Sequence, residues 1–166
     1  LTTTYSYEDD EPGTGLADDG LLRKVVDPLG NETSFSYDEL GNVLTITDPL
    51  GNTTFNTYHP GTNFVATTTD AAGHVTSYSY DVRGMMDKET RTVTTSNGSG
   101  DPVVQTLVTD YDYDASGYLV KMTDAVGHPT VYENDANGNR LREITSRTAN
   151  GAAVPVITEH EYDEQD

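Results

Sequence analysis

One stretch near the first third of the chain decides the fold: Tyr37-Asp38-Glu39-Leu40-Gly41-Asn42-Val43-Leu44-Thr45-Ile46-Thr47-Asp48-Pro49-Leu50-Gly51-Asn52-Thr53-Thr54. It contains two turn signals, Tyr-Asp-x-x-Gly and Asp-x-x-Gly, separated by a short segment rich in Thr, Val and Ile. β-Branched residues favour a pleated strand, and Asp, Pro and Gly favour tight turns. The stretch therefore predicts one strand with a hairpin turn at each end.

Both turn signals recur along the chain. The structural residues of the Tyr-Asp-x-x-Gly signal are Tyr37, Asp38 and Gly41, then Tyr80, Asp81 and Gly84, then Tyr113, Asp114 and Gly117, with Asp135 and Gly138 in a copy that lacks the Tyr. Those of the intervening signal are Asp48 and Gly51, Asp70 and Gly73, and Asp124 and Gly127, and Asp27-Pro28-Leu29-Gly30 is a further copy. The turn Asp recurs every ten or eleven residues outside one interruption, so a full unit has about 21 residues.

This spacing leaves about six residues between turns, which suits a strand and is too short for a stable helix. The Asp side chain accepts hydrogen bonds from the backbone two or three residues on, and Gly supplies the positive φ that closes the hairpin with a bulge. We therefore predict an all-β fold of tandem antiparallel β-hairpins, stacked into a continuous curved or coiled sheet, as in an open shell or solenoid segment.

Aromatic residues occur two apart in the strands that enter the Tyr-Asp turns, as at Phe35 and Tyr37 or Tyr111 and Tyr113. Alternate residues of a strand lie on one face. Neighbouring hairpins should therefore align these pairs into an aromatic ladder, the main core that this composition can build. The ladder could instead present tyrosines for stacking on sugars, and packing is the preferred interpretation.

Three segments interrupt the rhythm, near residues 8–19, 96–102 and 146–152. Extra residues at a hairpin tip cost little, because loop entropy grows only logarithmically with length. We interpret them as hairpin-tip insertions within a single array of about seven imperfect units over residues 1–166.

These residues resemble the YD repeat, also called the Rhs repeat, of bacterial Rhs proteins, toxin-complex shell proteins and the teneurin barrel. Residues 37–54 are close to that consensus throughout. The resemblance implies a structural β-sheet shell that can enclose a cargo, commonly a toxin. A closed shell needs more units than seven. Self-cleavage is not expected, because both Asp-Pro-Leu-Gly copies are followed by Asn, at Asn31 and Asn52.

The composition excludes several functions. The 166 residues include 28 acidic and 9 basic side chains and no Cys, which removes disulfides, thiol nucleophiles and Cys-bound metals. A net charge of −19 opposes nucleic-acid and anionic-lipid binding. No apolar run is long enough for a membrane-spanning helix, and no signal peptide opens the sequence, so the chain is cytosolic or a leader lies outside it.

The acidic residues suggest no catalytic site, because most occupy the same turn position in every repeat. We expect no catalytic residue and no cofactor. Calcium is the one alternative, at an acidic cluster with no EF-hand spacing: Asp9, Asp10, Glu11, Asp18 and Asp19, with Glu8 beside them. A solvated acidic loop is the preferred interpretation, and no metal site is predicted. The histidines follow or replace turn residues and indicate repeat drift.

We therefore expect a non-catalytic scaffold, a wall segment of a large secreted or cell-surface Rhs-type protein that encapsulates a toxin or serves adhesion. Its partners would be neighbouring YD repeats of the same or an identical chain, with an encapsulated cargo or a cell-surface glycan as further candidates, and neither nucleic acid nor membrane insertion. Two alternatives stay open: a filament subunit joined head to tail through its terminal strands, and a carbohydrate-binding adhesion module.

Overall fold

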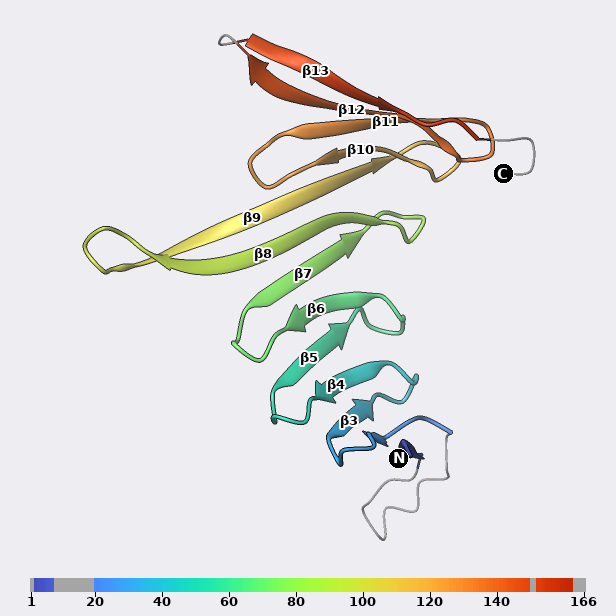
Figure 1. The fold of residues 1–166 in the computed structure, drawn as a ribbon, viewed down its shortest axis with the longest axis vertical. Coiled ribbons are helices and arrows are strands. Elements are labelled where there is room, and N and C mark those ends of the chain that lie inside the picture. The colour runs from blue at the N-terminus through green and yellow to red at the C-terminus, as the bar shows by residue number, and fades with distance from the viewer. Residues whose placement is uncertain (1, 8–19, 150–151, 163–166) are drawn as a thin grey trace. The chain divides into compact units, whose positions relative to one another are not determined.

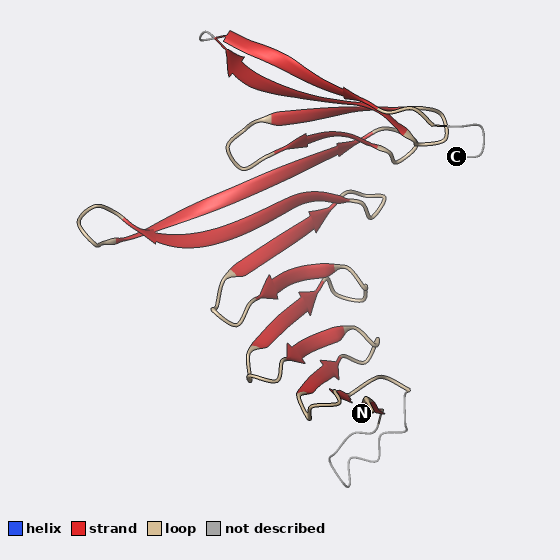
Figure 2. Ribbon diagram, viewed as in Figure 1, coloured by secondary structure: helices blue, strands red, loops and turns tan. Residues whose placement is uncertain are grey.

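A computed structural model describes residues 2–7, 20–149 and 152–162. The described residues form 13 strands of an antiparallel sheet, and no helix (Figures 1 and 2). The strands lie side by side in chain order from β1 to β13, and these two end strands do not pair with each other. The predicted all-β fold of tandem hairpins in an open sheet is confirmed. No helix in the described part of the chain could span a membrane.

The chain divides into two compact units, Leu1–Ser77 and Tyr78–Asp166. The first unit holds β1 (Thr4–Ser6), β2 (Lys24–Val26), β3 (Glu32–Tyr37), β4 (Val43–Thr47), β5 (Thr53–Tyr58), β6 (Val65–Thr69) and the start of β7 (Val75–Tyr80). Its strands are short because a turn arrives every ten or eleven residues. The pairs Phe35 with Ile46 and Ile46 with Thr54 set the register of β3, β4 and β5.

The second unit holds the end of β7, β8 (Met86–Ser96), β9 (Pro102–Tyr113), β10 (Leu119–Thr123), β11 (Pro129–Asn134), β12 (Arg140–Ala149) and β13 (Ala152–Glu159). β8 and β9 have 11 and 12 residues, about twice the length of β10 and β11, and pair with each other to their tip, where Ser96 lies opposite Pro102. β12 and β13 form a second long hairpin. Thus residues 96–102 lie at the tip of a longer hairpin, whereas residues 8–19 and 150–151 lie outside the described part.

A β-bulge follows several Tyr-Asp turns. The register shifts between Ser36 and Tyr37, between Thr57 and Tyr58, and between Glu133 and Asn134, in each case at the last residue before the turn. A bulge increases the local twist and redirects the side chain at its position. In each case the extra residue lies in the strand that follows the turn, at Leu44, Ala66 and Leu141, so the added twist falls beside the residue that ends the strand before the turn.

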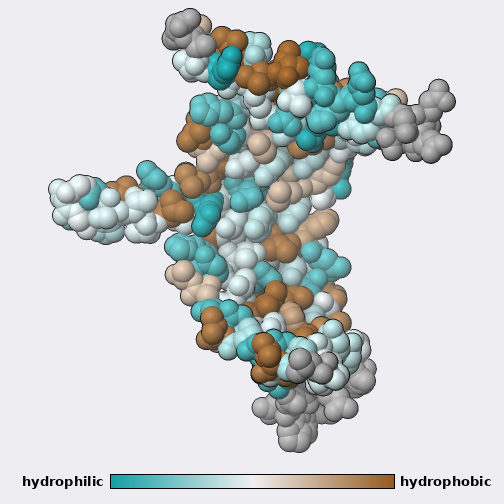
Figure 3. All heavy atoms as spheres, viewed as in Figure 1, coloured by the Kyte–Doolittle hydropathy of each residue, from teal (hydrophilic) through white to brown (hydrophobic). Residues whose placement is uncertain are grey.

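Burial is slight, because the described residues form a single sheet layer with no second layer on its faces. Among the described residues, Tyr132 is the one buried hydrophobic side chain, at 8% exposure, and Asn42 is the one buried polar side chain. Several members of the expected aromatic ladder are exposed, among them Tyr5, Tyr7 and Tyr162. Figure 3 shows polar and apolar residues intermixed on the face in view. The ladder is therefore a half-buried row, and hydrogen bonds must supply much of the order.

Candidate functional site

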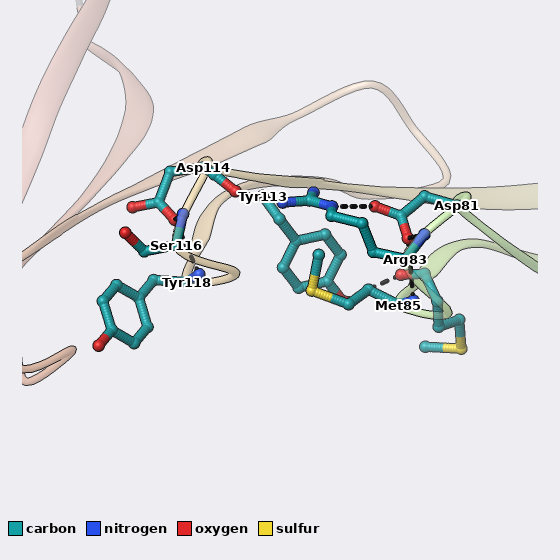
Figure 4. Close-up of polar contacts among 8 residues, drawn as sticks. Asp81, Arg83, Met85, Tyr113, Asp114, Ser116 and Tyr118 are labelled. Carbon is teal, nitrogen blue, oxygen red and sulfur yellow. Dashed lines mark hydrogen bonds and ion pairs between the residues drawn. The ribbon is translucent and has the colours of Figure 1, made fainter.

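The turn carboxylates have one arrangement throughout the described repeats. In the turn at Asp48, the Oδ1 atom accepts hydrogen bonds from the backbone N–H groups of Leu50 at 2.8 Å and Asn52 at 2.9 Å. The same two bonds form at Asp27, Asp38, Asp70, Asp81, Asp114, Asp124 and Asp135. Figure 4 shows this arrangement at Asp81 and Asp114. One carboxylate oxygen therefore supports the whole five-residue turn.

The turn glycine completes this geometry. Its N–H donates to the carbonyl of the turn Asp, and φ is positive at Gly41, Gly51, Gly73, Gly84, Gly117, Gly127 and Gly138. The N–H of the Asp in turn donates to the carbonyl of the residue after the glycine. These are type I turns closed by a glycine bulge, the three-residue hairpin connection.

The side chain of the residue after the glycine contacts the second carboxylate oxygen of the turn Asp. The Nδ2 atoms of Asn31, Asn42, Asn52 and Asn139 donate to Oδ2 of the Asp that opens their turn. His74 places its Nδ1 atom 2.9 Å from Oδ2 of Asp70. These side-chain bonds are the largest cause that lowers the pKa of Asp48 and of Asp70 below the ordinary value. The carboxylates are ionised turn supports.

One turn reverses the donor and the acceptor. At the tip of the β8–β9 hairpin, Asn97 takes the place of the Asp and Asp101 takes the place of the Asn. The Asn97 Oδ1 atom accepts from the N–H groups of Ser99 and Asp101, and its Nδ2 atom donates to Oδ2 of Asp101 at 3.2 Å. The hydrogen-bonding pattern is kept although the two side chains are exchanged.

The tyrosine before the turn has a second role, which sequence reasoning missed. The hydroxyl groups of Tyr37, Tyr58, Tyr113 and Tyr162 donate to the backbone carbonyls of Leu22, Val43, Met86 and Arg140. Asn134, in the copy that lacks the Tyr, donates from Nδ2 to the carbonyl of Leu119. Tyr80 ends β7 at the equivalent position. We call these contacts the staples. Each joins the hairpin around one Tyr-Asp turn to the hairpin around the preceding turn of that kind.

Each staple lies just beyond the end of a backbone ladder. The first pairs of β4 with β5 and of β8 with β9 are Thr45 with Phe55 and Lys88 with Asp110. The stapled carbonyls, of Val43 and Met86, lie two residues before these pairs. The offset is the same at Leu22, Leu119 and Arg140. A side-chain donor therefore continues the bonding between hairpins where paired backbone ends.

The Tyr-Asp turns lie along one side of the sheet, at the strand ends, and contacts join one such turn to the next. Arg83 donates from Nη1 to the carbonyl of Asp114 at 2.6 Å, and Asn42 donates from Nδ2 to the carbonyl of Thr62. A Cβ atom at Gly138 would overlap the ring of Tyr118. On the opposite side, a Cβ atom at Gly51 would have no neighbour within 4 Å, and Leu50 is 87% exposed. The turn at Gly51 is therefore packed less closely than the turn at Gly138.

Arginines cover part of the tyrosine face. The guanidinium carbon of Arg140 lies 3.9 Å from the centroid of the Tyr132 ring, and that of Arg23 lies 5.0 Å from the Tyr37 ring. A cation over the face of an aromatic ring is attracted to its negative face. The Arg140 side chain therefore contributes to the burial of Tyr132.

The metal candidates are not tested. Asp9, Asp10, Glu11, Asp18 and Asp19 lie outside the described residues, as does Glu8. Within the described ranges, no group of three His, Cys, Asp or Glu residues is placed to hold a metal ion. His74 and His128 both follow a turn glycine, where they face Asp70 and Asp124.

A depression in the second unit is lined by aromatic and charged side chains. Its volume is about 570 Å³, and Tyr113, Tyr118, Tyr162, Arg140, Glu143 and His160 are among its lining residues. Three tyrosine side chains therefore line the depression, together with charged groups. The hydroxyl groups of Tyr113 and Tyr162 are already used in staples, which leaves their ring faces for contact.

Comparison with known proteins agrees with the repeat geometry. The RHS Repeat family model matches residues 18–53 and 61–99. No curated protein sequence matches the chain significantly. The fold is similar to the crystal structure of TcdB2-TccC3-Cdc42, with a TM-score of 0.58 and 16% identity over 84% of this chain and 8% of that chain. For TcdB2-TccC3-TEV, the values are 0.54 and 17% over 87% and 9%.

At these identities the two crystal structures show the fold alone, and this chain spans less than a tenth of each compared chain. The family match is independent of them and includes the regular turns at Asp27, Asp38, Asp48, Asp70 and Asp81. The resemblance to the YD repeat is confirmed: residues 18–53 and 61–99 match the RHS Repeat family model, and they lie within an all-β sheet of tandem hairpins.

Proposed function

We propose that this chain is a wall segment of a large secreted or cell-surface protein of the Rhs type, which encloses a cargo or serves adhesion. The observation that carries the proposal is the staple between successive hairpins, which continues the backbone ladder at Tyr37, Tyr58, Tyr113 and Tyr162. A wall needs attachment that repeats with every unit, and the staple supplies it. Its partners are then the neighbouring repeats.

A wall of this kind works mechanically. Each hairpin contacts only its neighbours, so stability is a sum of similar units and of the interfaces between them. The turn carboxylates support this role because their oxygen atoms already accept hydrogen bonds from their own turns, as at Asp38 and Asp48. They are poorly placed to act as general acids or bases, which favours a non-catalytic function and a fold that needs no cofactor.

Electron microscopy of the native gene product tests the proposal. We expect a hollow shell, or a shell fragment, in which the sheet continues on both sides of this chain. Replacement of Tyr37, Tyr58 and Tyr113 by Phe should make the shell less stable to heat, while leaving the particle's shape unchanged at low temperature. Compact particles without a sheet wall, or a shell whose stability ignores the three tyrosines, would contradict it.

A filament is the second candidate, and the two end strands favour it. Among the described strands, β1 and β13 each pair on one side only. Unpaired edges invite pairing with another chain. This candidate predicts fibres in micrographs, and deletion of residues 1–7 or 160–166 should prevent their formation. Fibres that persist in both deletions would reject this mode of assembly.

A glycan-binding role is the third candidate, and the aromatic depression favours it. Rings of Tyr113, Tyr118 and Tyr162 offer faces on which a sugar can stack, with Arg140 and Glu143 as polar partners. Glycan-array hits that are lost in Tyr118→Ala and kept in Tyr111→Ala, outside the lining, would support this role. An array without hits would remove it and leave the wall proposal unaffected.

A further inference from the structure

The hairpin of β8 and β9 extends beyond the rest of its unit and has a bare edge (Figure 1, green and yellow strands). β9 pairs with β8 from Pro102 to Asp110. Its pairing with β10 covers only Tyr113 to Asp110. The side of β9 that faces away from β8 therefore has no partner strand from Pro102 to Thr109 within the described chain.

The turn determines which backbone groups this edge presents. The Asn97 N–H donates to the Asp101 carbonyl, so this opposed pair is a hydrogen-bonded pair. In an antiparallel hairpin such pairs alternate with pairs whose N–H and C=O groups point outward. Val104, Thr106 and Val108 therefore direct their backbone groups to the bare edge. Pro102, which has no N–H, falls in the same outward phase, where proline is tolerated.

This part of the chain is electrically neutral. Residues 91–109 contain one basic and one acidic side chain, Arg91 and Asp101, in a chain whose net charge is −19. Repulsion between two copies is therefore weak at this hairpin. Its sequence is rich in Thr and Val, and no Lys, Glu or Pro interrupts β9 from Val103 to Thr109. Natural edge strands commonly use those residues to prevent pairing.

We infer that the outer edge of β9 is a docking site for a second copy of this chain, whose β9 strand pairs with it antiparallel about a two-fold axis. Such an interface is self-complementary, because the same residues contribute from both copies. This contact goes beyond the proposed wall function, because it joins two chains through the projecting β8–β9 hairpin and not through successive repeats. A strand from a different protein is the competing occupant.

Sedimentation of the full chain over a wide concentration range provides the test. We expect a reversible dimer that Thr106→Pro weakens about tenfold or more, because the outward N–H is lost and the ring obstructs the incoming strand. The bonds of β9 to β8 use the other phase and remain. Val104→Lys is a second variant, which introduces a charge at the same edge. Ile157→Pro is the matched control, because it blocks the outer edge of β13.

Amide hydrogen exchange gives a readout that does not depend on a variant. On dimerisation, the amides of Val104, Thr106 and Val108 should exchange more slowly, while those of Val103 and Gln105, already bonded to β8, should not change. A chain that stays monomeric at all concentrations would overturn the inference and leave a foreign strand as the occupant. Association lost in Ile157→Pro and kept in Thr106→Pro would also overturn it, in favour of head-to-tail assembly.

Discussion

The hydroxyl group of Tyr113 donates a 2.9 Å hydrogen bond to the carbonyl of Met86, 27 residues earlier in the chain. Met86 lies two residues before the first pair of β8 with β9, which is Lys88 with Asp110. The bond therefore continues the contact between these strands past the end of their ladder. The long β8–β9 hairpin separates the two residues in sequence, and yet the geometry matches that of Tyr58 and Val43, which are 15 residues apart.

Removal of a single hydroxyl group should show what a staple contributes. Tyr113→Phe should lower the free energy of unfolding by about 1 kcal/mol, because the Met86 carbonyl has no other side-chain donor among the described residues. Tyr58→Phe should cost less, about 0.5 kcal/mol, because Asn56 also donates to the Val43 carbonyl. Denaturant unfolding followed by circular dichroism measures both. Equal losses would mean that the second donor is unimportant.

Exchange of the two side chains of a turn should restore what either single change removes. Asp48→Asn places two amide groups face to face, and Asn52→Asp places two carboxylates face to face, so each should lower the melting temperature by about 2 °C. The double variant recreates the arrangement of Asn97 and Asp101 and should melt close to the wild type. A double variant that loses the sum of the single effects would contradict this account.

Substitution of two glycines with similar backbone angles should have unequal effects. Gly127→Ala forces a Cβ atom into the left-handed region, at φ +85°, and should cost about 1–2 kcal/mol. Gly138→Ala has the same strain, at φ +91°, and in addition meets the Tyr118 ring, so it should cost more. Tyr118→Ala should remove that difference. Thermal unfolding of the four proteins is the measurement.

Acid should destabilise the sheet in a defined range. The pKa values of Asp27, Asp38, Asp48, Asp70, Asp81 and Asp124 are lowered from 3.8 in the folded chain, mainly by hydrogen bonds within their turns. Groups with lowered pKa values stabilise the fold above their unfolded value and lose that contribution as pH falls through the folded value. The melting temperature should therefore be level from pH 7 to about 5 and fall below about 4.

The alkaline side should show the opposite sign. Partial burial is the main cause that raises the pKa values of Tyr58, Tyr111 and Tyr113 above 10.0. Their contribution is complete below the unfolded value and is lost as pH rises through the folded one. Spectrophotometric titration should show these three tyrosines ionising above pH 10.0. Loss of the fold before any tyrosine ionises would contradict this prediction.

The local parts of this protein could be predicted from sequence. The Asp, the Gly and the residue after the Gly lie within five positions. Their hydrogen bonds therefore depend on the local backbone of one turn, which these residue types predict. The spacing of turns then determines strand length, and alternation determines which residues share a face. In this way the sequence alone assigns Asp48 and Gly51 to a hairpin turn, and Phe35 and Tyr37 to one face of a strand.

What tertiary structure decided lies between hairpins. The destination of each tyrosine hydroxyl depends on strand register, on the bulge at the end of the strand and on the twist that they produce, over 15 to 27 residues of sequence. The sequence predicted an aromatic ladder but could not show how exposed its members are, because burial requires a second layer and the described residues form a single one. Where a single layer cannot bury its rings, hydrogen bonds at their hydroxyl groups hold one hairpin to the next.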